Sequence, residues 1–263
     1  MNNRLIQTMR AANRNGKKLF CAYVTLGFPR LSVTEALLPV LEEAGVDILE
    51  LGFPFSDPLA DGPTIQFASE AAIKQKVRLQ HAFHLIRKLR KKGFKIPVLL
   101  FSYLNPVMHY GISQTLRQLR QSGFDGLIVP DLPPEEGRMW EPWFKRHQLS
   151  LVYLVAPTTP AKRIREIANR SSGFVYYVSL KGVTGARRAL PLDLKRKLKT
   201  VKQNTRKPVL VGFGVSNEKQ ARAISEVADG VIVGSAIVSR LKRGQKAIQS
   251  VRSFVSGLVR SIR

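Results

Sequence analysis

Short apolar runs alternate with longer amphipathic stretches along the whole chain. Most of these runs are continuously apolar, which is typical of strands covered on both faces of a parallel sheet. The stretches between them have helical spacing, and glycines such as Gly45 and Gly123 mark expected helix ends. The eight runs cover residues 19–26, 47–52, 96–102, 126–130, 150–155, 174–179, 208–214 and 230–234.

This repetition of strand and helix predicts an α/β fold, a (β/α)8 TIM barrel, for the 263 residues. A doubly wound open sheet is the alternative. No change in composition and no flexible linker divides the chain, so residues 1–263 are expected to form a single domain. Residues 248–262 are basic and amphipathic, a pattern that could bind a membrane surface. An outer barrel helix explains the pattern without a further partner, and we adopt that interpretation.

The formal net charge is +25, from 43 Lys and Arg against 18 Asp and Glu, and it would attract anions. The basic residues are spread along the chain, so we expect a solvated basic surface and no nucleic-acid partner. The single cysteine, Cys21, excludes an internal disulfide and a cysteine-based metal site. The chain shows no signal-peptide core and no apolar run of membrane-spanning length. We therefore expect a cytoplasmic protein without a metal site or a membrane partner.

Glu50 is a carboxylate within an apolar run, near the end of the second predicted strand. In a (β/α)8 barrel the chemistry lies at the carboxyl ends of the strands. If Leu49 and Leu51 face the outer helices, Glu50 faces the interior, where burial should raise its pKa. Such a group can transfer protons near neutral pH. A structural ion pair with a basic neighbour is the alternative.

The loop after this strand is rich in proline and carries two aspartates. Asp61 lies at the far end of this loop, just before a predicted helix. Its position in the sequence is equally compatible with a catalytic role and with a role as a turn or helix-cap residue. Asp57, in the sequence Ser56-Asp57-Pro58, is better explained as a turn residue or a contact to a partner than as a catalyst.

Three glycine-bearing loops follow the sixth, seventh and eighth predicted strands, at residues 181–185, 212–214 and 234–235. Glycine lets backbone N–H groups approach an anion, and barrels often bind phosphate after strands seven and eight. The loops therefore indicate a phosphorylated substrate. Either Tyr176 or Tyr177 must face inward, and strand parity does not decide which. Lys181 could form a Schiff base, as in lysine-dependent aldolases, or remain a solvated charge.

The motif ELGFPFSDPLADGPTIQ, at residues 50–66, closely resembles the signature of the tryptophan synthase alpha subunit family. Further matching motifs follow in the same order along essentially the whole chain: VTLGFP (24–29), YLNPV (103–107), VPDLP (129–133), APTTP (156–160), YYVSLKGVTGAR (176–187), GFGVS (212–216) and GSAIV (234–238). The resemblance implies a (β/α)8 barrel that cleaves indole-3-glycerol phosphate to indole and glyceraldehyde 3-phosphate by a reverse aldol reaction, without a metal or organic cofactor.

The resemblance also implies roles for individual residues. Glu50 matches the family's proton-transferring glutamate, Asp61 matches the aspartate that stabilises positive charge on the indole nitrogen, and Tyr176 matches a tyrosine near the glycerol chain. The phosphate site matches Gly185, Gly214, Gly234 and Ser235. The indole pocket would include Phe101 and Tyr23, and Tyr23 stands where the family often has phenylalanine.

The resemblance further implies a partner. In this family the alpha subunit pairs with a beta subunit that carries pyridoxal phosphate and receives indole through a channel, in an alpha2beta2 tetramer. The contact surface would include Pro54, Asp57, Asn105 and Pro106, although these residues could merely shape the barrel mouth. Two alternatives remain open: a Lys181 Schiff-base aldolase acting on a phosphorylated substrate, and a non-catalytic subunit that binds ligand and activates its partner.

Overall fold

The apolar runs form a nine-stranded parallel sheet in the computed structural model, which describes residues 3–178, 192–242 and 247–263. The strand order is β5-β4-β3-β2-β1-β9-β8-β7-β6, and every pairing between neighbours is parallel. The strands are β1 (Leu19–Thr25), β2 (Ile48–Gly52), β3 (Val98–Phe101), β4 (Gly126–Ile128), β5 (Ser150–Val152), β6 (Leu154–Val155), β7 (Val175–Val178), β8 (Val209–Gly212) and β9 (Gly230–Val233).

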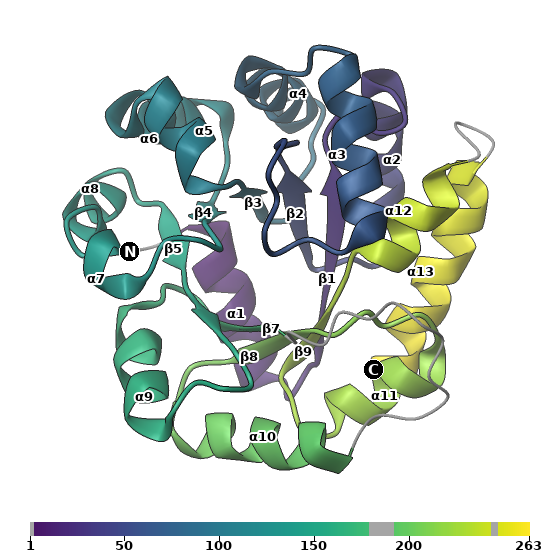
Figure 1. The fold of residues 1–263 in the computed structure, drawn as a ribbon. Helices are drawn as coiled ribbons and strands as arrows, with labels where there is room; N and C mark the ends of the chain where they lie inside the picture. Colours follow the sequence, from purple (N-terminus) through teal and green to yellow (C-terminus); the bar gives the residue numbers. More distant parts are fainter. Residues whose placement is uncertain (1–2, 179–191, 243–246) are drawn as a thin grey trace.

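Most helices surround this sheet on its outer side, whereas the N-terminal helix lies behind the strands in the view of Figure 1. In the described part of the chain they are α1 (Arg4–Arg14), α2 (Leu31–Glu43), α3 (Pro63–Lys74), α4 (Leu79–Lys91), α5 (Leu104–Tyr110), α6 (Ile112–Ser122), α7 (Pro134–Gly137), α8 (Glu141–Arg146), α9 (Ala161–Arg170), α10 (Leu192–Gln203), α11 (Glu218–Ser225), α12 (Ser235–Leu241) and α13 (Ile248–Ile262). The helix α6 ends at Gly123, which has left-handed backbone geometry, as the sequence predicts.

The barrel closes through the run predicted as a single strand at residues 150–155. That run forms β5 and β6, the two ends of the sheet order, with only Tyr153 between them. The β5 half pairs with β4 and the β6 half pairs with β7. At the break, the backbone N–H of Tyr153 donates to Ser171 Oγ at 3.0 Å. The predicted (β/α)8 barrel is therefore confirmed, with its fifth strand divided because its halves pair with different neighbours.

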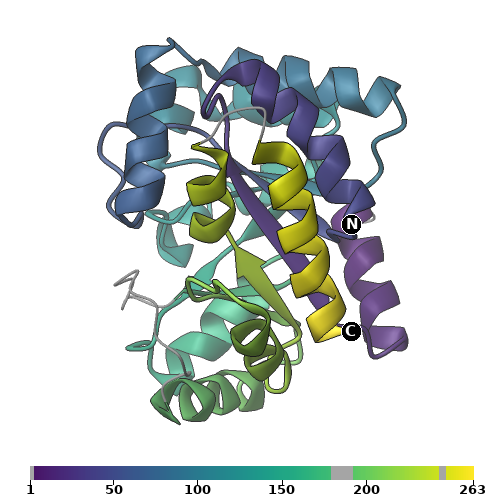
Figure 2. The same cartoon turned by 90° about the vertical axis from the view of Figure 1, so that its right-hand side faces the viewer.

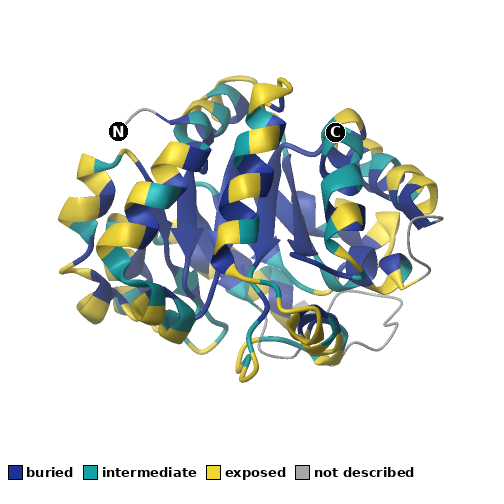
Figure 3. Ribbon diagram, turned by 90° about the horizontal axis from the view of Figure 1, so that it is seen from above, coloured by how far each residue is buried: buried dark blue, intermediate teal, exposed yellow. Residues whose placement is uncertain are grey.

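The core consists of the strands and the inner faces of the helices. All residues of β1 to β5 and of β9 are buried. Figure 3 shows these buried strands enclosed by helices whose outward faces are exposed. The basic helix α13 packs against α2, α11 and α12 on the outside of the barrel (Figure 2), which confirms the prediction of an outer helix. No helix in the described ranges is long and apolar enough to cross a membrane.

A repeated aspartate contact joins strands at the base of the barrel, which we define as the end where the strands begin. Asp47, Asp125 and Asp229 each directly precede a strand. Each carboxylate accepts a backbone N–H from the adjacent strand, and each also pairs with a basic side chain. The N–H donors are Phe20, Val98 and Val209, at 2.9, 3.0 and 2.7 Å, and the cations include Lys17, Arg90 and Lys202.

Both chain ends attach to this base. Asn3 Nδ2 donates to the backbone oxygen of Asp125 at 2.9 Å, beside the start of β4. At the other end of the chain, the Arg263 guanidinium donates to Gly45 O at 2.9 Å and pairs with Asp47, beside the start of β2. Figure 3 shows the two ends on the same edge of the molecule. The opposite end of the barrel, the rim where the strands end, is thereby free of the chain termini.

Candidate active site

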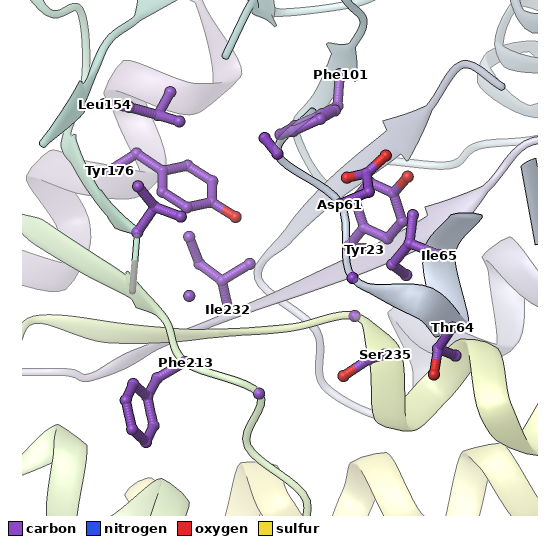
Figure 4. A pocket seen from close by; sticks show the side chains of 16 residues that line it. Tyr23, Asp61, Thr64, Ile65, Phe101, Leu154, Tyr176, Phe213, Ile232 and Ser235 are labelled. Carbon is purple, nitrogen blue, oxygen red and sulfur yellow. The ribbon is translucent and has the colours of Figure 1, made fainter. Parts of the chain in front are cut away.

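A cavity of about 160 Å³ opens at the rim, where the sequence predicts a site. Figure 4 shows Asp61 and Tyr23 on one side of it and Tyr176 and Leu154 on the other. The predicted residues that line it are Tyr23, Asp61, Phe101, Tyr176, Gly214, Gly234 and Ser235. Sequence reasoning did not identify several other lining residues, notably Thr64, Ile65, Leu154, Phe213 and Ile232.

Glu50 lies inside the barrel but is not among the residues that line the cavity. Its side chain is fully buried, and its Oε1 accepts a hydrogen bond from the thiol of Cys21 at 3.3 Å. Oε2 has no hydrogen-bond partner among the described residues. Burial raises the pKa of Glu50 to about 8, and the Cys21 thiol together with the nearby Tyr176 side chain opposes part of this rise. No ion pair within the described ranges includes Glu50, so the alternative of a structural ion pair finds no support there.

Asp61 lies in the wall of the cavity, at the end of the proline-rich loop. Burial raises its pKa to about 7, and a hydrogen bond from the Tyr103 side chain opposes the rise. Tyr103 also fixes the loop, because its hydroxyl oxygen accepts the backbone N–H of Ala60 at 3.0 Å. Both carboxyl groups therefore have raised pKa values, with that of Glu50 the higher. At a pH between the two values, a protonated Glu50 and an ionised Asp61 are favoured in the same barrel.

Aromatic rings form the apolar side of the cavity. Tyr23 and Phe101 meet edge to face, with ring centroids 5.5 Å apart. A Cβ atom at Gly52 would lie 2.1 Å from the Tyr23 hydroxyl oxygen, so only glycine leaves room for this ring. Tyr176 is the tyrosine that lines the cavity, whereas Tyr177 is buried and does not. The structure thus decides the parity question that the sequence left open, and a flat apolar substrate would fit against these rings.

A second part of the cavity, next to Tyr23, has the features of an anion site. Gly214 has a positive φ of +57°, and a Cβ atom there would meet nothing within 4 Å, so its backbone faces open space. Gly234 and Ser235 begin α12, and the first N–H groups of a helix point outward without intrahelical partners. Gly214, Gly234 and Ser235 all line the cavity. The predicted fourth member, Gly185, lies outside the described residues, as does Lys181.

Two rim loops next to the cavity carry the predicted partner contacts. Phe55 stacks on Tyr103 with ring centroids 5.3 Å apart, which joins the loop after β2 to the one after β3. Asp57 and Asn105 are exposed and Pro106 is half-buried, but Pro54 is buried in this chain and cannot offer a free surface. The sequence reasoning missed two exposed apolar residues on the same segments. Leu59 is 91% exposed and Met108 is 54% exposed.

The described residues contain no group of three or more His, Cys, Asp or Glu side chains that could hold a metal ion. Fold and cavity together define the class of protein: a (β/α)8-barrel enzyme whose site lies at the carboxyl ends of its strands. Residues 9–260 match the family model described as tryptophan synthase alpha chain. The chain belongs to the tryptophan synthase alpha chain family.

Individual relatives support the same family. The tryptophan synthase alpha chain of Halalkalibacterium halodurans is 46% identical over 258 residues, covering 94% of this chain and 97% of the relative. That of Geobacter sulfurreducens is 40% identical, covering 98% of both chains. The crystal structure of tryptophan synthase alpha chain from Legionella pneumophila subsp. pneumophila superposes with a TM-score of 0.91 at 34% identity, covering 100% of this chain and 98% of that chain. A structure of Mycobacterium tuberculosis tryptophan synthase superposes with a TM-score of 0.91 at 35% identity, covering 100% and 99%.

Proposed function

We propose that this chain cleaves indole-3-glycerol phosphate to indole and glyceraldehyde 3-phosphate, as the alpha subunit of a tryptophan synthase. The observation that carries the proposal is the presence in one barrel of two carboxyl groups of raised pKa, Glu50 in the interior and Asp61 in the wall of the rim cavity. Family membership supports the same reaction. The aromatic side of the cavity suits the indole ring, and the Gly214, Gly234 and Ser235 side suits the phosphate.

The reaction needs two carboxyl groups with different tasks. Breaking the bond between C3 and the glycerol chain leaves electrons on the indole ring unless C3 is first protonated. A protonated Glu50 can supply that proton, and its ionised form can then accept the proton of the glycerol hydroxyl as the carbonyl of glyceraldehyde 3-phosphate forms. Protonation at C3 makes the ring nitrogen positive, and the carboxylate of Asp61 stabilises this charge. Tyr176 lines the cavity and also interacts with Glu50, so its side chain connects the buried carboxyl group to the cavity.

The partner proposed for this subunit is a beta subunit that carries pyridoxal phosphate, in an alpha2beta2 tetramer that works in the cytoplasm. The exposed Leu59 and Met108 beside the cavity support a docking surface at the rim, with Asp57, Asn105 and Pro106 at its polar positions. The alpha subunit itself would use no metal and no organic cofactor. We also propose that residues 1–263 constitute one barrel domain.

An indole-release assay tests the proposed reaction, with purified chain alone and with a purified beta subunit. We expect indole in both settings from the wild type. Glu50→Gln should lower turnover by about 10²–10⁴-fold, the usual contribution of general acid–base catalysis, while calorimetry still detects binding of substrate. Glu136→Gln, on an exposed side chain of α7, is the matched control. Wild-type turnover in Glu50→Gln would remove Glu50 from the proposed role, and indole release by neither preparation would favour a ligand-binding subunit.

A further inference from the structure

The thiol of Cys21 makes a direct contact with the carboxyl group of Glu50 inside the barrel. Sγ lies 3.3 Å from Oε1, and both side chains are fully buried. In the register of β1 and β2, Glu50 is opposite Tyr23, whereas Cys21 is opposite Ile48. Because Cys21 comes two residues earlier on a parallel strand, Glu50 must lean back toward the base of the barrel to reach it.

The contact occupies one carboxyl oxygen and leaves the other available. Oε2 of Glu50 has no hydrogen-bond partner among the described residues, although it is buried. Burial keeps the thiol protonated, since desolvation raises the pKa of Cys21 well above its usual value. The protonated thiol can donate but cannot accept the proton of Glu50 at ordinary pH. Cys21 does not line the cavity, so substrate would not touch it.

We propose that Cys21 is a positioning residue whose thiol holds the carboxyl group of Glu50 toward the base of the barrel, and that the donor strength at position 21 tunes how readily Glu50 serves the reaction. The inference rests on the proposed function, because it assigns Glu50 the proton transfer. An S–H group is a weak donor, so the contact is firm enough to orient the carboxyl and weak enough to release it. A stronger donor should hold Glu50 back, and an apolar side chain should free it.

The groups around Glu50 define which effects the test must separate. Cys21 and Tyr23 face it from β1, and Tyr176 faces it from β7. Asp61 acts on both tyrosines from the loop above, and Asp47 acts on Cys21 from the base. Substitutions at position 21 leave all of these other groups in place. A change in the ionisation of Glu50 can therefore be assigned to the lost or strengthened donor.

Three variants separate a hydrogen-bonding role from a packing role. Cys21→Ser strengthens the donor, whereas Cys21→Ala and Cys21→Val remove it at a smaller and a larger volume. The pH profile of kcat/KM reports the pKa of Glu50 in the free enzyme. We expect Cys21→Ala and Cys21→Val each to raise the pKa of Glu50 by about 0.5 and Cys21→Ser to lower it, since hydrogen-bond donors favour the ionised carboxylate. At the optimum pH, kcat should rise two- to threefold in Cys21→Ala and Cys21→Val and fall in Cys21→Ser, with KM unchanged in all three variants.

Two results would overturn the inference. One is a set of pKa and kcat values that follows side-chain volume, with Cys21→Ala and Cys21→Ser alike and Cys21→Val close to the wild type. The other is a pH profile of kcat/KM that does not change in any variant. A second readout keeps this test independent of the proposed reaction. Urea unfolding of the same variants between pH 6 and pH 9.5 also reports the ionisation of Glu50. If the wild type released no indole, the proposed function would fail, while the order of the unfolding curves would still show whether the thiol holds Glu50.

Discussion

A buried carboxyl group with a raised pKa should make this barrel less stable as the pH rises. Glu50 is fully buried, and burial raises its pKa from 4.5 to about 8. Between these values the folded chain holds a proton at Glu50 that the unfolded chain has released. Stability therefore falls as the pH rises from about 4.5 to about 8 and stays low above that. Glu50→Gln keeps the shape of the side chain and removes the ionisation.

The size of the effect follows from the two pKa values. Linkage gives a destabilisation by Glu50 of about 2 kcal/mol at pH 6 and about 5 kcal/mol at pH 9.5. The difference in unfolding free energy between Glu50→Gln and the wild type should thus grow by about 3 kcal/mol over this range. Asp61 also has a raised pKa, but its contribution is present in both proteins and cancels in the difference.

Urea unfolding followed by circular dichroism, at half-unit pH intervals, measures this difference. The control is Glu136→Gln, in which an exposed glutamate is neutralised without change in a buried group. We expect the control curve to run parallel to that of the wild type. Parallel curves for Glu50→Gln and the wild type would refute the reasoning, because they would mean that Glu50 has the same pKa in the folded and the unfolded chain.

Three further predictions concern the cavity and the base. Gly214→Asp should weaken binding of glycerol 3-phosphate at least tenfold in calorimetry, because it places an anion in the open space beside the proposed phosphate site. Gly214→Asn tolerates the same backbone geometry without the charge and should bind glycerol 3-phosphate more tightly than Gly214→Asp does. Equal affinities of the two variants would exclude a charge effect. Asp61→Asn should reduce kcat by at least tenfold with little change in affinity for glycerol 3-phosphate, and an unchanged kcat in the indole assay would count against its role. Asp125→Asn should lower the unfolding free energy by about 3 kcal/mol, because the Arg90 guanidinium, only 11% exposed, loses its carboxylate partner and keeps only backbone carbonyl acceptors. KM should stay constant, and a changed KM would show that base and rim are coupled.

The sequence predicts the barrel well because its signal is local. Continuous apolar runs and glycine helix ends repeat along the chain, and each strand needs only its own residues to be recognised. The same local signal places Asp61 at the end of the loop after the second strand, whereas Phe101 is assigned to the pocket by the family resemblance; both residues line the cavity. It also predicts one strand at residues 150–155, and the break at Tyr153 escapes it, because that break depends on pairing with both β4 and β7.

Depth within the barrel and long-range contacts are not visible in the sequence. Alternation shows that Glu50 faces inward, but not that its carboxyl leans toward Cys21, 29 positions earlier, instead of lining the cavity. Pro54 illustrates the same limit, since its burial depends on how the loop packs. Tyr103 supports Asp61 and fixes Ala60 from a different loop, and only its place at the start of the YLNPV motif after a predicted strand could have pointed to it.

The attachment of both termini to the base has a practical consequence for handling this protein. Asn3 and Arg263 are tied beside strand starts, on the end of the barrel away from the cavity. A purification tag, a fluorescent reporter or a surface linker fused at either terminus would extend away from the mouth through which substrate enters. Immobilised enzyme attached by its terminus should therefore keep both the cavity and the proposed docking surface accessible.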